Sequence, residues 1–209
     1  MFRKIIKELK DHAPFTAIGA VSGVFIMVLF RGLSAKASYN IFYLLHPLHV
    51  FLSALATTSM YEFYKKCSIN KKKCNIFVLV IIGYVGSIGI ATLSDSIIPY
   101  ISEVLLDMPR KELHLGFIEE WWLINPLAIA GIALAYFKPA TKVPHYGHVL
   151  LSTWASLFHI IMAGGQILSW VYFLAIVIFL FVAVWVPCCV SDIVFPLMFV
   201  RNKERIKEC

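Results

Sequence analysis

Charged side chains are scarce in this 209-residue chain: Asp, Glu, Lys and Arg make up 15% of it, against 60% hydrophobic residues. A soluble domain needs enough polar residues to cover its core. This composition, with a mean hydropathy of +0.79, does not supply them. The scarcity of charge excludes an ordinary soluble domain and favours an integral membrane protein.

Motifs that mark many soluble enzymes and nucleic-acid-binding proteins are also missing. The chain has no nucleophile elbow, no P-loop and no dinucleotide-binding glycine pattern. Its formal net charge is +7, but the basic residues form no stripe interleaved with aromatic residues, so we expect no nucleic-acid partner. The five cysteines form no disulfide framework, because all fall at or near the predicted cytoplasmic side, where thiols stay reduced.

Long apolar runs are what the sequence has instead. A helix needs about 20 apolar residues to cross a bilayer. Six runs are candidates: Pro14–Phe30, Pro47–Phe63, Ile76–Tyr100, Trp121–Phe137, His145–Ala163 and Ile167–Phe199. The last is longer than one span, so we expect it to be kinked or broken near Pro187 or Pro196. The predicted fold is all-α, a polytopic membrane protein with six transmembrane helices and the lipid bilayer as its partner.

The placement of lysine and arginine predicts the orientation. Of the 19 basic residues, only Arg31, Lys36, Arg110 and Lys111 fall in segments on one side of the predicted membrane. All others fall on the side that holds the N-terminus, and basic residues concentrate on the cytoplasmic side of membrane proteins. We therefore expect a multi-pass protein of the cell membrane with both termini in the cytoplasm.

Six of the seven histidines form two copies of one pattern. Each copy has a leading histidine, a His-x-x-His pair at the start of a predicted span, and an Asp-x-x-x-Pro motif near the end of the next span. The first copy contains His12, His46, His49 and Asp95; the second contains His114, His145, His148 and Asp192. Both members of the pair recur after 99 residues. The pattern predicts two related halves, residues 1–104 and 105–209.

The two halves are expected to be inverted relative to each other. Each has three predicted spans, an odd number, so the second half enters the membrane from the opposite side. Inverted repeats of this kind build many secondary transporters. The topology predicts two sites on opposite faces of the bilayer, each completed by a histidine from the other half. One contains His46, His49, Asp95 and His114; the other contains His12, His145, His148 and Asp192.

These residue types suit a metal ion. Histidines three positions apart lie on one face of a helix, about 5–6 Å between Cβ atoms, so each pair can direct two imidazoles at one ion. Imidazoles with a carboxylate suit a divalent transition metal such as Zn²⁺, Mn²⁺ or Fe²⁺, and ligand type alone does not select one of them. Pro47 follows His46 and Pro144 precedes His145, so we expect each pair in the first turn of its helix.

The Asp-x-x-x-Pro motif adds a second signal. Proline has no N–H, so Pro99 and Pro196 leave the carbonyls of Asp95 and Asp192 without their helical partners. We expect each aspartate to lie at a kink, where it can present both its carboxylate and a backbone oxygen. Aspartate in a span costs at least about 2.5–3.5 kcal/mol at the bilayer centre and is by default a functional candidate.

Other residues in the spans have structural interpretations. His159 has no counterpart in the first half, and we expect it to be a packed polar residue. Gly83, Gly86 and Gly89 recur every three residues and predict a close helix-packing face. Serines and threonines one turn apart follow each histidine pair, Ser152 among them, and are expected to make interhelical hydrogen bonds or to line a path.

The paired motifs His46-x-x-His49 and His145-x-x-His148, with Asp95 and Asp192, resemble those of divalent-metal transporters of the manganese type. That resemblance implies a permease for a divalent metal ion. The chain is short for a complete transporter, which favours a homodimer.

Two other functions stay open. In an intramembrane metal-dependent hydrolase, zinc held by histidine and aspartate would activate water. Membrane hydrolases of the ceramidase type share this ligand chemistry, but here the candidate ligands form two mirrored sets instead of one. In a non-catalytic membrane protein, the polar pairs would only hold the helices together. Transport is the function that the duplicated pattern favours, and the sequence does not decide whether the chain is an enzyme.

Overall fold

A computed structural model describes residues 2–29, 33–65, 75–140, 142–164, 170–189 and 194–199. All regular elements in these residues are helical, as the composition predicts. In chain order they are α1 (Phe2–Leu29), α2 (Ala35–Lys65), α3 (Ile76–Thr92), the π-helical segment η2 (Leu93–Ile97), α4 (Ile98–Leu105), α5 (Gly116–Glu119), α6 (Trp121–Phe137), α7 (Lys142–Gly164), α8 (Trp170–Cys189) and α9 (Phe195–Met198).

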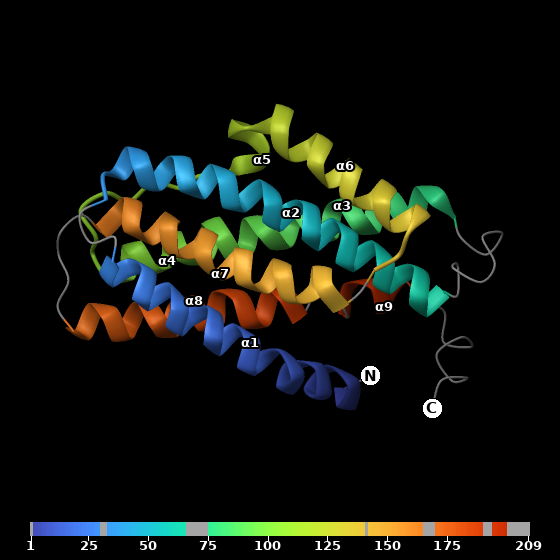
Figure 1. Cartoon of the computed structure of the whole chain (residues 1–209), viewed down its shortest axis with the longest axis horizontal. Coiled ribbons are helices and arrows are strands. Elements are labelled where there is room, and N and C mark those ends of the chain that lie inside the picture. The colour runs from blue at the N-terminus through green and yellow to red at the C-terminus, as the bar shows by residue number, and fades with distance from the viewer. Residues whose placement is uncertain are drawn as a thin grey trace.

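Helix α2 lies in the middle of an elongated bundle and packs against α3, α6 and α7 (Figure 1). Its most extensive partner is α7. Helix α1 packs on α7 and α8, while α6 packs on α2 and α3. Near the two ends of the bundle, α4 contacts α7 and α9 contacts α2. The pair α2 and α7 therefore forms the core on which the other helices lie.

The helices alternate in direction. In Figure 1, α1, α3 and α7 run from right to left, whereas α2, α6 and α8 run from left to right. Helices that hold the same place in the two halves of the chain, such as α2 and α7, therefore run in opposite directions.

The bundle has polar side chains inside and apolar side chains outside. Fully buried polar residues follow one another along α2: Ser38, His46, His49, Ser53, Thr57, Thr58, Ser59 and Glu62. Outward-facing residues of α1 and α8 are large and apolar, at helical spacing: Ile18, Val21, Phe25, Leu174, Ile178, Val182 and Val186. This is the reverse of a water-soluble protein, and such an outer surface suits contact with lipid.

Within the described residues, three helices are long and apolar enough to cross a membrane: Ala35–Lys65, Ile76–Leu105 and Tyr146–Gly164. Three shorter apolar helices accompany them: Thr16–Leu29, Trp121–Phe137 and Leu174–Cys188. In the length and composition of its helices, the prediction of a helical membrane protein is confirmed. Of the three shorter helices, α6 has 17 residues and is about 25 Å long at 1.5 Å per residue, which is at the lower limit for a span.

Helix α2 begins earlier than predicted, so the expected position of the first histidine pair was wrong. The helix starts at Ala35, so His46, Pro47 and His49 lie in its middle and not in its first turn. Proline inside a helix is tolerated in a membrane protein where neighbouring helices surround the freed backbone, and Pro47 is itself buried. In α7, by contrast, Pro144 does lie in the first turn, because that helix starts at Lys142.

The last apolar run contains two helices. Pro187 lies inside α8, which continues to Cys189, and Pro196 is the second residue of α9. Residues 190–193 lie outside the described part of the chain, so the predicted kink or break is not tested there. The third run extends five residues further than predicted, to Leu105.

Two of the three glycines of α3 lie at close helix contacts. A Cβ at Gly83 would lie 2.3 Å from Thr58 Oγ1 and 2.6 Å from Ile132 Cγ1, and one at Gly86 would lie 2.9 Å from Thr57 Cγ2. No atom lies within 4 Å of a Cβ at Gly89. The predicted packing face is thus confirmed at the first two positions and wrong at the third.

The crowded position Gly83 and the open position Gly89 allow a paired test of packing on one helix. We expect Gly83→Ala to lower the free energy of unfolding by about 1–3 kcal/mol, because β-branched neighbours cannot move aside cheaply. Gly89→Ala should be neutral or stabilising by up to about 1 kcal/mol, because it only restricts the unfolded chain. Unfolding in detergent micelles, followed by circular dichroism, measures both variants; equal losses would contradict this packing.

Candidate metal centre

Asp95 lies at a local break in the long helix α3–η2–α4. Over Leu93–Ile97 the backbone is π-helical, and the N–H of Ile98 donates to the carbonyl of Leu93, five residues earlier. Pro99, four residues after Asp95, has no N–H to continue α-helical bonding there. The departure from α geometry therefore lies where the Asp-x-x-x-Pro motif predicts it. π-Helical turns inside α-helices occur frequently at functional sites.

Both histidines of the first pair converge on one oxygen of Asp95. The Nδ1 atom of His46 lies 2.8 Å from Asp95 Oδ2, and that of His49 lies 2.6 Å from the same atom. All three residues are at most 1% exposed. A hydrogen bond to a carboxylate requires a proton on each Nδ1, so both imidazoles donate to Asp95.

Serine hydroxyls occupy the other oxygen. Asp95 Oδ1 accepts hydrogen bonds from Ser94 Oγ and Ser152 Oγ, both at 2.7 Å. Ser156 Oγ, one turn further along α7, donates to the Ser94 carbonyl at 2.9 Å. The prediction that serines after the second histidine pair bond across helices is thus confirmed for Ser152 and Ser156. Asp95 has four donors from three elements, which offset the loss of water on burial.

His46, His49 and Asp95 form a group that fits a metal ion. One ligand atom from each lies within 4.8 Å of the others, and all three residues are buried. Two imidazole nitrogens and a carboxylate, without thiolate, suit Zn²⁺, Mn²⁺ or Fe²⁺. The present N···O distances are those of hydrogen bonds. A tetrahedral ion at about 2.0–2.1 Å from its ligands keeps them about 3.3 Å apart, so binding requires a small expansion of this triad.

Aromatic rings hold the two imidazoles in place. Phe42 is stacked on His46, with ring centroids 5.2 Å apart and planes 10° apart. His148 is stacked on His49 in the same way, at 5.8 Å and 10°. The Nδ1 atom of His148 lies 3.1 Å from the carbonyl of Pro144. The first histidine pair is thus enclosed between α3–η2, α7 and its own helix.

The position of His148 corrects the expected placement of the two sites. We expected it on the opposite face of the bilayer from His49, but the two rings are in contact. The reason is the early start of α2, which puts His49 near the middle of the helix, where α2 passes α7. His49 and His148, one histidine of each pair, thus meet inside the bundle.

His114 is not part of the triad's ligand group. Its Nδ1 lies 3.2 Å from Glu119 Oε2, an oxygen that also accepts a hydrogen bond from the Tyr43 hydroxyl. Burial disfavours the Glu119 carboxylate, but hydrogen bonds from Tyr43, His114 and the amide of Leu115 outweigh it and hold the pKa of Glu119 below its ordinary value. His114 thus anchors the segment before α6 at the end of the bundle.

Three other predicted ligands lie outside what the structure describes. Asp192 is among residues 190–193, and the side chains of His12 and His145 are not described. The mirrored site predicted at His12, His145, His148 and Asp192 stays a prediction.

Glu103, a buried acid, was not among the predicted site residues. Glu103 is fully buried and its Oε1 lies 2.7 Å from Nδ1 of His159, so His159 is a packed polar residue, as expected, but one with a charged partner. The available signal was a glutamate eight residues after Asp95, on what proves to be the same helix. Ending the third span at Tyr100 removed Glu103 from consideration.

Comparisons with known proteins give no relative. No family model matches the chain, and no curated protein or solved structure is significantly similar to it. The candidate function therefore rests on the chemistry of the site.

Ser152 and Ser53, which occupy equivalent places after the two histidine pairs, give a matched test of this geometry. Ser152→Ala removes a donor to a buried carboxylate and should lower the free energy of unfolding by about 1.5–3 kcal/mol. The buried Ser53 hydroxyl has no hydrogen-bond partner among the described residues, so Ser53→Ala should change stability little or raise it. Equal losses in thermal unfolding of the two purified variants would argue against the proposed role of Ser152.

Proposed function

We propose that this protein is a multi-pass membrane permease that binds a divalent transition-metal ion at His46, His49 and Asp95 and carries it across the bilayer. The observation that carries the proposal is the buried triad itself. Ionisable residues inside membrane proteins are costly and concentrate on ion pathways and proton relays. A role limited to holding helices together would not need an aspartate and two histidines at one point.

The triad links metal binding to proton movement. Without a metal ion, protons on the two Nδ1 atoms face Asp95. A metal ion bound at Nδ1 displaces the proton from that atom, so an ion and a proton compete for each imidazole nitrogen. Exchange of a proton for a metal ion keeps the buried charge low in both states. The proposed transport is therefore coupled to proton movement in the opposite direction.

The proposed architecture is six spans in two inverted halves, residues 1–104 and 105–209. It is supported by the opposite directions of α2 and α7 and by the contact pattern, in which α1 lies on α7 and α8 as α6 lies on α2 and α3. The contact of His49 with His148 supports a common path at the interface of the halves, where transporters built from inverted repeats hold their substrates. We further propose the cell membrane as the location, with both termini in the cytoplasm.

Loss of the carboxylate tests the function. We expect Asp95→Asn, which keeps the shape of the side chain, to weaken Zn²⁺ binding at the triad by at least about 10–100-fold. Uptake of Zn²⁺, Mn²⁺ or Fe²⁺ into proteoliposomes should fall to the rate of empty liposomes. A fluorescent metal indicator and a pH dye inside the vesicles measure both sides of the exchange.

A matched control is available in the turn that follows the same helix. Asp107 is an aspartate whose side chain is 91% exposed and paired with Lys111, so Asp107→Asn should keep wild-type binding and uptake. Wild-type uptake by Asp95→Asn would overturn the proposed function. Turnover of a lipid substrate without ion flux would instead indicate an intramembrane hydrolase.

A further inference from the structure

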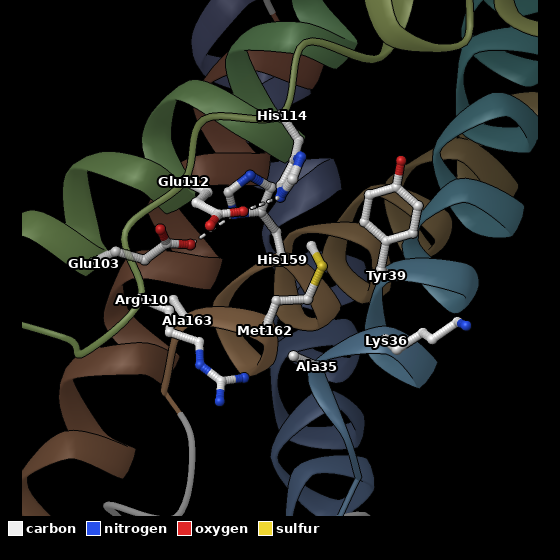
Figure 2. A pocket seen from close by; sticks show the side chains of 10 residues that line it. All are labelled: Ala35, Lys36, Tyr39, Glu103, Arg110, Glu112, His114, His159, Met162 and Ala163. Atoms are coloured by element: carbon white, nitrogen blue, oxygen red, sulfur yellow. Dashed lines mark hydrogen bonds and ion pairs between the residues drawn. The ribbon is translucent and has the colours of Figure 1, made fainter.

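A cavity of about 410 Å³ opens at one end of the bundle, where α2 begins and α4 and α7 end. Glu103 of α4 and His159 of α7 line it (Figure 2). Both are almost completely buried, and they are joined by the 2.7 Å hydrogen bond between Glu103 Oε1 and His159 Nδ1. The cavity thus reaches a buried acid–imidazole pair that is separate from the triad.

Each member of this pair keeps one polar atom without a partner. Glu103 Oε2 and His159 Nε2 are inaccessible to solvent and have no hydrogen bond among the described residues. Burial of an unpaired polar atom is costly, more so for a carboxylate, and native proteins rarely leave one without a reason. Each of the two atoms can therefore accept a ligand, and one ion reaches both only if the hydrogen bond between Oε1 and Nδ1 breaks.

Two further potential ligands approach from the loop between α4 and α5. Figure 2 shows Glu112 and His114 directed toward Glu103 and His159. Glu112 Oε2 lies 3.8 Å from His114 Nε2, and the rings of His114 and His159 are 5.5 Å apart between centroids. Two carboxylates and two imidazoles, from three segments of the chain, thus surround one cavity. They lie further apart than the ligand atoms of the triad, so binding of one ion requires these side chains to close on it.

The charges around the cavity favour a cation. Lys36 and Arg110 also line the cavity, but Figure 2 shows their charged ends directed away from the four converging side chains. Both residues are exposed, so water surrounds their charges. Glu103, which is fully buried, is then the acid of the inner wall, while Glu112, with its side chain 76% exposed, lies at the rim. A cation beside Glu103 would offset a carboxylate there.

We infer that Glu103 and His159, with Glu112 and His114 at the rim, form a second site for a divalent transition-metal ion. Nitrogen and oxygen ligands of this kind are those that Zn²⁺, Mn²⁺ and Fe²⁺ accept. The site shares no ligand with His46, His49 and Asp95, so its existence does not depend on the triad. It also gives His114, an expected ligand, a place at a site other than the predicted one.

Phe42 separates the two sites. The ring of this fully buried residue is stacked on His46 at 5.2 Å and meets His159 edge to face at 5.4 Å between centroids. An ion in the cavity is therefore separated from the triad by one aromatic ring. That this site supplies ions to the triad past Phe42 rests on the proposed function.

Ion counting tests the second site. Purified protein in detergent is titrated with Zn²⁺ at pH 7 by calorimetry, and bound zinc is measured after gel filtration. We expect two ions per wild-type chain. Glu103→Gln and Asp95→Asn should each lose one of them, with the affected affinity reduced at least about tenfold, while Asp107→Asn should keep both.

The outcomes separate this inference from the proposed function. One ion in the wild type that only Asp95→Asn removes would overturn the second site and leave the triad intact. One ion that only Glu103→Gln removes would overturn the triad and support the second site.

A measurement on wild-type protein covers the case in which Glu103→Gln fails to fold. Zn²⁺ should shift the imidazole ¹⁵N NMR signals of His159 in ¹⁵N-histidine-labelled protein, and should do so equally in Asp95→Asn. Unchanged His159 signals at saturating Zn²⁺ would overturn the second site.

Discussion

A carboxylate buried among apolar helices is stable only where donors surround it, and in this protein that requirement falls on Asp95. Its two oxygens accept from His46, His49, Ser94 and Ser152, which come from α2, the π-helical turn and α7. Because these donors must stay within hydrogen-bond distance, they fix the relative positions of the three elements. The glycine contacts of α3 allow the helix backbones to approach. The rings stacked on the two histidines keep their imidazoles in position. Both features are consistent with this arrangement.

The same constraint gives the interior its chemical character. Polar residues along α2 are buried while the outer faces of α1 and α8 carry large apolar side chains, so charge can be held only inside the bundle. Two acid–histidine groups lie there, Asp95 with its pair and Glu103 with His159, and Phe42 contacts a histidine of each. In a medium of low dielectric, a proton or a metal ion is the natural counterion for such carboxylates. Competition between the two is the physical basis of the proposed coupling.

The sequence predicted the helical class, the membrane character and the meeting of His46, His49 and Asp95, because each follows from a local pattern: apolar length, i,i+3 spacing and the proline after an aspartate. It failed where tertiary packing decides. Pro47 was taken as a helix start, although neighbouring helices let α2 continue through it from Ala35. That error placed the histidine pairs at opposite faces, when His49 and His148 are in contact. Glu103 was missed for a related reason, since the end of a helix is the least certain part of a pattern.

The most direct test of the triad is the location of a bound ion. Crystals of the protein grown with Zn²⁺ can be measured at wavelengths on both sides of the zinc absorption edge. The account predicts an anomalous peak about 2.0–2.2 Å from His46 Nδ1, His49 Nδ1 and an Asp95 carboxylate oxygen, with the direct hydrogen bonds between these atoms broken. An intact set of N···O contacts at 2.6–2.8 Å, with no peak at the triad under saturating zinc, would contradict it.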